Sequence, residues 1–373
     1  MKTAIVHEWF VDYMGSEKCV ESFTNIWLES DVFALIDFLN EDERKKILKG
    51  KKAITTFVQN LPRAKSSHRL YLPLYPMAIE QLDVSNYDVI ISSSHSVAKG
   101  VLTNSKQLHI CYCHTPMRYA WDLYHQYINE SGLQKSIKGF FAKYFLHKIR
   151  IWDYVSAKRV DYFIANSNYI AKRIKKVYGR DADVIYPPVD VDRFQLEKEK
   201  EDYYLIVSRF VPYKKVDVVV KAFSEMPDKK LVVAGSGPDE DKIKKIAASN
   251  IEFRGYQSEV ELTKLMQKAK AFVYAAEEDF GITIVEAQAA GTPVIAYGIG
   301  GAGETVINGK TGILFNEQTP VALINAVKEF ESNSNNFDSE FIRTHSLKFS
   351  REVFEQKIEE YVRTKYNENK SLS

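Results

Sequence analysis

The chain has 373 residues, of which 45% are hydrophobic, 13% aromatic and 27% charged, a composition of folded globular proteins that excludes a disordered or fibrous chain. This length is enough for two domains, and the formal net charge of +2 excludes the chain-wide basic excess of a protein whose main partner is nucleic acid. The charge is uneven, because residues 1–186 carry 26 basic and 19 acidic residues, a net of +7, whereas the remainder carries 25 and 30, a net of −5.

Short apolar runs alternate with helix-length amphipathic segments along the whole chain, which is the pattern of α/β proteins. Several runs are rich in β-branched residues, as buried parallel strands are. The first series of predicted strands covers residues 3–7, 31–35, 54–58, 88–92, 109–113, 162–166 and 183–185. The second series covers residues 204–207, 231–234, 251–254, 271–274, 293–296 and 312–315, with helices such as 239–248, 258–268 and 282–290 between them. The sequence therefore predicts two doubly wound domains.

Residues 186–202 lie between the two series and predict a linker. Pro187 and Pro188 prevent helix formation, and the charged run after them favours solvent. We expect an N-terminal domain of residues 1–187 and a C-terminal domain of residues 188–350, with a last helix over about 351–373 that packs back on the first. Ligands bind at the carboxyl ends of strands in doubly wound sheets, so two facing domains would place a site in the cleft between them.

The cysteines and the N-terminal residues give an indication of the cellular compartment of the protein. Cys19, Cys111 and Cys113 are an odd number, which argues against a disulfide framework. Cys111, Cys113 and His114 have no second pair of ligands at zinc spacing elsewhere in the chain. Residues 1–7 lack the apolar stretch of a signal peptide, and no run approaches 18 uncharged apolar residues. We therefore expect a cytoplasmic protein.

The turn and helix after the fourth strand of the second series carry the clearest chemical signal. Glu278 precedes Phe280 and Gly281, a helix is predicted from Ile282, and Glu286 lies about one and a half turns inside it. The first backbone amides of such a helix have no hydrogen-bond acceptor within the helix. Together with the helix dipole, they can therefore bind a phosphate group. The Glu286 carboxylate can accept hydrogen bonds from a ribose diol. The alternative is a solvated turn with capping acids, but the spacing of the two glutamates favours a ligand site.

At these residues the chain resembles the retaining family-4 glycosyltransferases of the GT-B fold, in which two facing Rossmann-like domains hold the active site in the cleft between them. The resemblance implies that Glu286 binds the ribose of a nucleotide sugar and that Glu278 lies beside the donor sugar. It places the amides of Phe280, Gly281 and Ile282 on phosphate and sugar oxygens.

A second motif agrees with the first. Arg209 and Lys214 follow the strand at 204–207 and look like the pair of cations that the family carries at a separation of five. Two fixed cations suit a reaction in which a nucleoside diphosphate leaves with growing negative charge, because they stabilise the transition state more than the bound substrate. Lys215 is the alternative to Lys214 in this assignment.

In the first domain the resemblance points to two further positions. The strand at 3–7 leads to Gly15, where a glycine lets the backbone approach the diphosphate closely. Relatives usually carry two glycines here, whereas this chain has Ser16. The strand at 109–113 ends at His114, which matches a histidine that touches the donor sugar in relatives. A histidine that only caps or packs is the alternative.

The segments 114–122 and 186–190 look closest to bacterial mannosyltransferases of O-antigen and capsule assembly. The resemblance implies an enzyme that moves mannose from GDP-mannose, with retention, to a lipid-linked or oligosaccharide acceptor such as a polyprenyl-diphosphate-linked glycan. Arg209, Lys214, Glu278 and His114 would be the catalytic groups. The alternatives are a UDP-sugar-dependent transferase of the same fold, a sugar-nucleotide epimerase and a noncatalytic nucleotide-sugar binder.

No cofactor is expected besides the nucleotide-sugar donor itself. Gly235 and Gly237 do not complete the Gly-x-Gly-x-x-Gly pattern of dinucleotide-binding proteins, which argues against an NAD enzyme. The Asp-x-Asp sequences at 181–183, 190–192 and 239–241 do not follow strand ends as metal ligands would in the other glycosyltransferase fold. We therefore expect no catalytic metal.

Residues 134–159 interleave basic residues with aromatic ones, a pattern suited to an anionic membrane interface. The aromatic residues are Phe140, Phe141, Tyr144, Phe145 and Trp152. The alternative is a helix that packs its aromatic side chains on the first domain. A lipid-linked acceptor would favour peripheral contact with the inner face of the cytoplasmic membrane.

Overall fold

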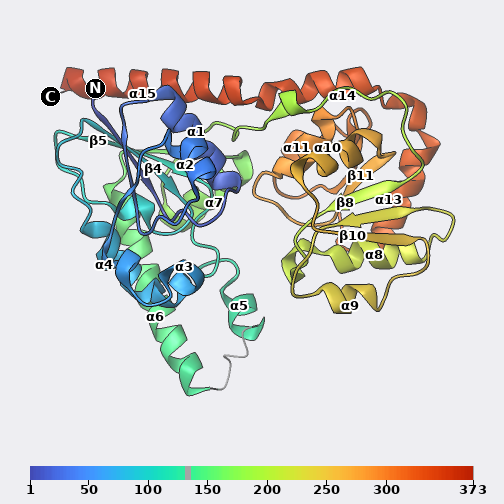
Figure 1. Cartoon of the computed structure of the whole chain (residues 1–373), viewed down its shortest axis with the longest axis horizontal. Helices are drawn as coiled ribbons and strands as arrows, with labels where there is room; N and C mark the ends of the chain where they lie inside the picture. Colours follow the sequence, from blue (N-terminus) through green and yellow to red (C-terminus); the bar gives the residue numbers. More distant parts are fainter. Residues whose placement is uncertain (131–135, 373) are drawn as a thin grey trace. The chain divides into compact units, whose positions relative to one another are not determined.

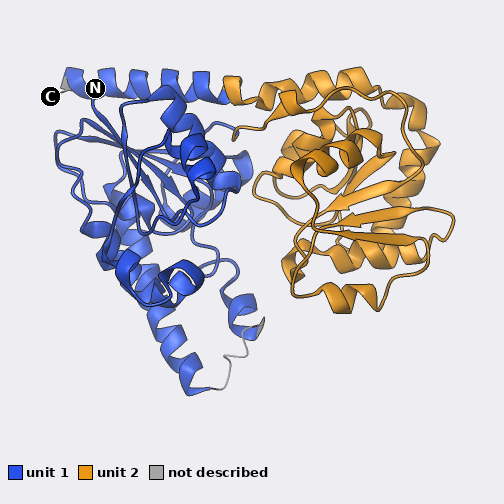
Figure 2. Cartoon of the chain, viewed as in Figure 1, with its two compact units in different colours: residues 1–186, 354–373 blue, residues 187–353 orange. Residues whose placement is uncertain are grey.

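The computed structural model describes residues 1–130 and 136–372 and divides into two compact units (Figure 1). Figure 2 shows unit 1, which comprises Met1–Tyr186 with Phe354–Ser373, and unit 2, which comprises Pro187–Val353. Each unit is an α/β domain built on one parallel sheet.

Within the described residues, unit 1 has a seven-stranded parallel sheet in the order β3-β2-β1-β4-β5-β6-β7. Its strands are β1 Thr3–His7, β2 Asp31–Ala34, β3 Ile54–Thr55, β4 Val89–Ser94, β5 Leu108–Cys113, β6 Tyr162–Ala165 and β7 Ala182–Val184. The chain order reverses between β1 and β4, where His7 is opposite Ser93. Such a switch point leaves a crevice at the carboxyl ends of the two strands, where doubly wound folds bind ligands.

Unit 1 also contains helices, which connect its strands or follow them. They are α1 Gly15–Ile26, α2 Glu41–Leu48, α3 Ala64–Ser67, α4 Tyr75–Glu80, α5 Tyr124–Glu130, α6 Ile137–Ser156, α7 Asn168–Tyr178 and α15 Arg351–Leu372. The last helix joins unit 1 through Phe354, Ile358 and Val362, which are buried and four residues apart on one helix face. The ring of Phe354 lies 5.9 Å from Phe23 and 5.5 Å from Tyr112, so α15 completes the core of the N-terminal sheet.

Unit 2 has, in the part of the chain that the structure describes, a six-stranded parallel sheet in the order β10-β9-β8-β11-β12-β13. Its strands are β8 Tyr204–Val207, β9 Leu231–Ala234, β10 Ile251–Gly255, β11 Ala271–Tyr274, β12 Val294–Tyr297 and β13 Gly312–Phe315. Its helices are α8 Val216–Ser224, α9 Glu240–Lys244, α10 Glu259–Lys268, α11 Ile282–Ala289, α12 Ala302–Thr305, α13 Pro320–Ser332 and α14 Ser339–Ser346. The switch point of this sheet lies between β8 and β11.

Every predicted strand is present, and five of them have the predicted bounds. The prediction was wrong at residues 56–58, where β3 ends at Thr55 and a 3₁₀ turn, Phe57–Asn60, follows. The cause is local, since the Thr56 hydroxyl donates to the Leu35 carbonyl at 3.0 Å and accepts from the Val58 amide at 3.3 Å. These bonds give the backbone an alternative to the sheet ladder.

The predicted linker is more ordered than its prolines and charges suggested. Val189, Val191 and Phe194 are buried in unit 2, and the Val189 amide donates to the Phe349 carbonyl at 3.0 Å. Asp190 pairs with Arg351 at 2.7 Å. The apolar residues between the charges therefore bring this segment into the fold of unit 2.

Candidate active site

The carboxyl end of β8 and the loop after β11 meet in a cluster of charged and polar side chains. Lys214, at the end of the 3₁₀ turn Pro212–Lys214, forms an ion pair with Glu278. The Tyr274 hydroxyl donates to the same carboxylate at 2.7 Å. Burial lowers the pKa of Lys214, but Glu278, Tyr274 and Tyr213 together raise that pKa by more, so the net change is upward. Lys214 is thus a fixed cation at the switch point of the sheet.

The neighbouring cations are in different environments. Arg209 follows β8 by two residues and is exposed, and within the described residues its side chain makes no ion pair or hydrogen bond. Lys215 has a left-handed backbone, with φ of 53°, and caps α8. In the described ranges, Lys214 contacts Glu278 and Lys215 does not. The structure therefore distinguishes the two lysines that the sequence left as alternatives.

The N-cap residue of α11, Gly281, lies three residues after Glu278. Gly281 caps the helix with φ of 87°, a conformation that favours glycine. Phe280 is buried, with its ring 5.5 Å from Phe349, and the Gly301 amide donates to the Glu278 carbonyl at 2.8 Å. A side chain at Gly301 would collide with the Phe280 backbone. The loop that carries Glu278, Phe280 and Gly281 is therefore held rigidly, and Ile282 begins the helix.

Glu286 lies inside α11 and has a partner that sequence reasoning missed. Arg193, in the 3₁₀ turn Val191–Arg193, places its guanidinium 3.1 Å from Glu286 Oε1 and 3.7 Å from Glu259. The guanidinium also packs over the Phe194 ring at 4.6 Å. Glu286 is only 5% exposed, so the arginine compensates a carboxylate that would otherwise be costly to bury. The one available signal was an arginine beside a buried aromatic residue in the linker.

In unit 1, His114 and Gly15 lie at the edge of the sheet where β1, β4 and β5 end. Gly15 is the first residue of α1. His114 directly follows β5, and its Nε2 lies 2.9 Å from the Ser93 hydroxyl. Burial, with His95 and His7 nearby, holds the pKa of His114 well below its ordinary value. His114 is therefore neutral at physiological pH.

Glu8 is a second residue at this edge that sequence reasoning missed. Its carboxylate is fully buried and accepts hydrogen bonds from the amides of residues 95–98 and from the Ser94 hydroxyl, at 2.7–3.2 Å. Burial raises the pKa of Glu8, but His95 and these amides lower it by more. Glu8 therefore fixes the loop after β4, the strand that carries Ser93. An acid directly after an apolar strand was the only sequence signal.

Other residues that the sequence raised as possible metal ligands make structural contacts instead. Asp181 pairs with Lys175 at 2.8 Å, and Asp183 accepts from the Tyr361 hydroxyl at 2.7 Å. The three cysteines are buried and free. The described residues contain no cluster of three or more histidine, cysteine or acidic side chains able to hold a metal ion.

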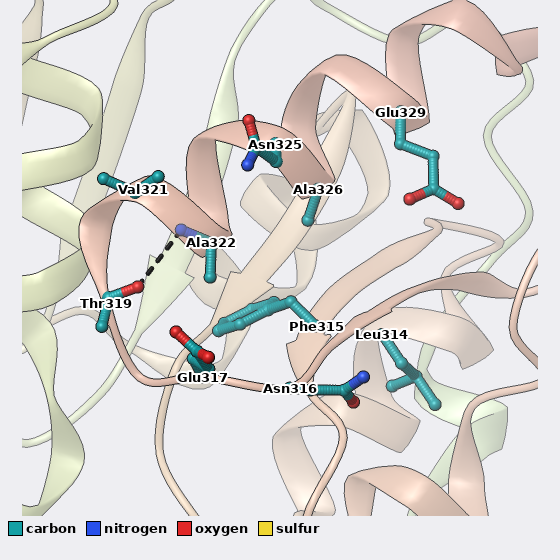
Figure 3. Close-up of a pocket in the computed structure, with 10 residues that line it drawn as sticks. All are labelled: Leu314, Phe315, Asn316, Glu317, Thr319, Val321, Ala322, Asn325, Ala326 and Glu329. Carbon is teal, nitrogen blue, oxygen red and sulfur yellow. Dashed lines mark hydrogen bonds between the residues drawn. The ribbon is translucent and has the colours of Figure 1, made fainter.

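A hollow with a volume of about 390 Å³ lies elsewhere in unit 2, between β13 and α13 (Figure 3). Its lining residues are Leu314, Phe315, Asn316, Glu317, Thr319, Val321, Ala322, Asn325, Ala326 and Glu329. Taken over the described residues, this lining holds two carboxylates and no cation. It therefore does not suit a diphosphate, and the charged cluster at the β8–β11 switch point is the better candidate.

Comparison with known proteins agrees with this fold. The family model described as "Glycosyltransferase Family 4" matches residues 29–193, and the model described as "Glycosyl transferases group 1" matches residues 189–345. HepE of Anabaena in complex with UDP has a TM-score of 0.73 at 16% identity, covering 98% of this chain and 100% of that chain. Sucrose-phosphate synthase of Thermosynechococcus elongatus has the same score, identity and coverage. The predicted fold class is thereby confirmed.

Curated relatives cover part of the chain. An uncharacterized glycosyltransferase of Methanocaldococcus jannaschii is 31% identical over 207 residues, which are 54% of this chain and 55% of that protein. D-inositol 3-phosphate glycosyltransferase of Mycobacterium tuberculosis is 31% identical over 180 residues, 41% of this chain and 37% of the relative. The chain thus spans about half the length of the first relative and less of the second. The two family models, which together extend from residue 29 to residue 345, and the shared architecture show that the chain belongs to the glycosyltransferases of the GT-B fold.

Proposed function

We propose that the protein is a retaining hexosyltransferase that moves mannose from GDP-mannose to a lipid-linked or oligosaccharide acceptor in cell-surface polysaccharide synthesis. The observation that carries the proposal is the Lys214–Glu278 pair beside the N-terminus of α11. A fixed cation and outward-pointing helix amides together suit a leaving nucleoside diphosphate. Unit 2 would bind the donor and unit 1 the acceptor.

In this proposal the side chains of unit 2 have separate tasks. Lys214 and Arg209 stabilise the charge that develops on the departing diphosphate, and the α11 amides bind its oxygens. Glu278 and Tyr274 hold Lys214 in position through the contacts described above, so little reorganisation is needed during the reaction. Glu286, held by Arg193, accepts from the ribose hydroxyls.

The donor base is the least constrained part of the proposal. The GDP-mannose assignment rests on the resemblance of segments 114–122 and 186–190 to mannosyltransferases. A UDP-sugar donor is the second candidate, and it is favoured by the likeness in fold to HepE, which has been solved with UDP-glucose at a TM-score of 0.70 and 16% identity. A test must therefore compare both bases.

The proposal can be tested by measuring the slow hydrolysis of donors by the purified protein. The donors are GDP-, UDP-, dTDP- and ADP-sugars, each assayed with and without EDTA. We expect turnover of GDP-mannose and not of the other donors, unchanged by EDTA. Preference for a UDP-sugar would overturn the mannosyl assignment and keep the transferase. Absence both of turnover and of nucleoside diphosphate binding by calorimetry would overturn the transferase itself.

The proposal includes peripheral contact with an anionic membrane through α6. Residues 134 and 135 of the predicted segment lie outside the described residues. Trp152 packs on unit 1 and donates to Glu80 at 2.9 Å, as the core-packing alternative expects. The face of α6 opposite its buried residues Leu146, Ile149 and Asp153 is exposed and apolar, and consists of Ile137, Phe140, Phe141, Tyr144, Phe145, Ile151 and Val155. Core packing thus accounts for the buried face of the helix, and the proposed membrane contact concerns its exposed face.

Charge on α6 supports an anionic partner. Lys138, Lys143 and Lys148 are exposed, and the one acid in the helix, Asp153, is fully buried. An apolar strip beside lysines, with no exposed carboxylate, suits the interface of an anionic bilayer. Among the described residues no helix is both long enough and apolar enough to span a bilayer.

Replacement of Phe140 and Phe141 together by serine should weaken binding to phosphatidylglycerol vesicles by roughly 10- to 100-fold, because two exposed rings lose their apolar contact with the acyl chains. Cosedimentation with vesicles measures the effect, and phosphatidylcholine vesicles should bind the wild type less. The control is Phe341→Ser, which removes an exposed ring of α14 and should leave binding unchanged. Full retention of vesicle binding by the double variant would refute membrane contact through α6.

A further inference from the structure

The helical stretch before β4 carries positive charge without a compensating acid of its own. Residues 61–79 contain Arg63, Lys65 and Arg69 and neither aspartate nor glutamate. All three basic side chains are exposed, and within the described residues none of them makes an ion pair or a hydrogen bond. This part of unit 1 therefore presents free positive charge, which attracts anions.

The same stretch exposes apolar side chains. Leu70 is 78% exposed, Met77 is 50% exposed, and Leu74 between them is also exposed. They lie in the 3₁₀ helix His68–Leu74 and in α4, and their spacing of four and three residues places them on one side of a helical segment. The other side is held in the core of unit 1 through Tyr75. Exposed apolar side chains beside free cations suit a ligand that is both apolar and anionic.

Aromatic packing connects this stretch to the carboxyl ends of β1 and β4. The ring of His68 lies 4.9 Å from that of Trp9, which follows β1, and the Trp9 ring lies 4.8 Å from that of His95, which follows β4. His68 Nδ1 also lies 2.8 Å from the Tyr75 hydroxyl. Arg69 is the next residue after His68, so it lies beside the switch point of the sheet.

The electrostatic effect of Arg69 agrees with this position. Burial lowers the pKa of His68 to about 4, and the charge of Arg69 adds to the lowering, whereas that of Asp12 opposes it. Burial also lowers the pKa of His95, Glu8 opposes this change, and Arg69 adds to it. Such charge interactions weaken with distance. The guanidinium is therefore close to both rings.

These features follow one another in the order of the groups of an amphiphile. The exposed leucines and Met77 offer apolar contact, Arg69 offers a cation, and the switch point carries serine and histidine side chains. We infer that residues 63–77 bind the isoprenoid diphosphate part of a lipid-linked acceptor, with the diphosphate on Arg69 and the first isoprene units on Leu70 and Leu74. The inference rests on the proposed function, in which unit 1 binds such an acceptor. The sugar that the diphosphate carries then faces the switch point.

The chemistry of the site favours a diphosphate at Arg69. A guanidinium presents a planar fork of donors that can bind a phosphate group through two hydrogen bonds. Arg63 and Lys65, six and four positions earlier in the chain, add charge for a second phosphate. The backbone amides at the switch point are already occupied, since those of residues 95–98 donate to the Glu8 carboxylate. An anion is therefore expected at Arg69 rather than at these amides.

Calorimetric titration of the full-length protein with farnesyl diphosphate, below its critical micelle concentration, tests the inference. No vesicle is present, so membrane contact through α6 does not contribute. We expect farnesyl diphosphate to bind at least roughly tenfold more tightly than inorganic diphosphate, because the isoprene units add apolar contact. Absence of binding, or equal affinity for the two compounds, would overturn the inference.

Variants of exposed residues locate the probe. Arg69→Ala should raise the Kd for farnesyl diphosphate roughly 10- to 100-fold, the effect of lost hydrogen bonds to a charged group. The double variant Leu70→Ser with Leu74→Ser should raise it roughly tenfold. The matched controls are Lys172→Ala, an exposed cation of α7, and Leu28→Ser, a leucine that is 60% exposed. Each control should change the Kd by less than about twofold.

Circular dichroism verifies the fold of each variant, and the exposure of the replaced side chains makes folding the expected result. A wild-type Kd in a folded Arg69→Ala protein would overturn the inference. An equal loss in Lys172→Ala would assign the effect to net charge and would overturn it as well.

A diphosphate also suits the proposed donor site of unit 2, so a competition experiment separates the two sites. Excess GDP, and separately excess UDP, should leave the Kd for farnesyl diphosphate unchanged. Displacement by either nucleotide would place the probe at the donor site and overturn the inference. Failure of the wild type to turn over any donor, with farnesyl diphosphate binding and its loss in Arg69→Ala intact, would contradict the proposed function but leave the isoprenoid diphosphate site in place.

Discussion

Replacement of Lys214 by alanine is expected to lower kcat for donor turnover by roughly 10²- to 10³-fold, the cost of removing one preorganised electrostatic group from an active site. The structure gives the reason. Lys214 is held at the switch point of unit 2 by Glu278, and the carboxylate raises its pKa despite burial. Because its pKa is raised above the ordinary value of lysine, Lys214 is charged throughout the physiological pH range, so a change of pH within that range should not compensate its loss.

Steady-state turnover of the preferred donor measures the effect, and circular dichroism checks that the variant is folded. The matched control is Lys215→Ala, which removes the adjacent lysine, a residue with no ion pair in the described ranges, and should leave kcat within about twofold of the wild type. Equal losses in the two variants would mean that net charge, rather than the Lys214 position, is responsible. An unchanged kcat in Lys214→Ala would refute its assignment to the leaving group.

Replacement of Asp153 by alanine should destabilise unit 1 by about 3–5 kcal/mol, the range for breaking a buried ion pair by removal of one partner. Asp153 has no exposed surface and Lys99 is 2% exposed, and the two form an ion pair. The same carboxylate accepts from Trp121 Nε1 at 2.8 Å and from the Tyr178 hydroxyl at 2.9 Å. Its loss leaves an ammonium ion and two polar donors buried without this acceptor.

Urea denaturation followed by tryptophan fluorescence measures this loss. All four tryptophans lie in unit 1, at positions 9, 27, 121 and 152, so the signal reports on that unit. With typical urea m-values, the midpoint should fall by roughly 1–2 M. Lys99→Met should cost less, because Asp153 keeps two donors.

The control for this prediction is Asp181→Ala, which breaks the exposed pair with Lys175 and should change stability by less than about 1 kcal/mol. A loss from Asp153→Ala as small as that of the control would show that the buried pair does not stabilise unit 1.

The periodicity of the sequence was sufficient to predict most of the fold. The strands β1, β8, β9, β11 and β13 have the predicted bounds, because buried parallel strands appear as short β-branched runs between turns. The error at β3 arose from a single hydroxyl, that of Thr56, which bonds to the backbone and ends the strand. The last helix, Arg351–Leu372, closely matches the predicted range, and its apolar spacing lets Phe354, Ile358 and Val362 pack on unit 1.

The candidate site was predicted in part. Short-range motifs singled out Lys214, Glu278 and Glu286 from the sequence, and the structure brings Lys214 and Glu278 together as an ion pair. The same motifs could not decide between Lys214 and Lys215, since the choice depends on the left-handed turn that directs one side chain toward Glu278. Arg193 was missed because its partner Glu286 lies 93 positions away in the chain.

The sequence by itself determined which residues form strands and helices and which charged residues follow strand ends, because those properties depend on neighbours within a few positions. Only the tertiary structure decided which groups form hydrogen bonds and ion pairs with one another. His7, Ser93 and His114 come from separate elements, and the pairing of β1 with β4 and of β4 with β5 brings them together. The hydrogen bonds of such buried groups depend on contacts rather than on composition, because each group there has only its neighbours as partners.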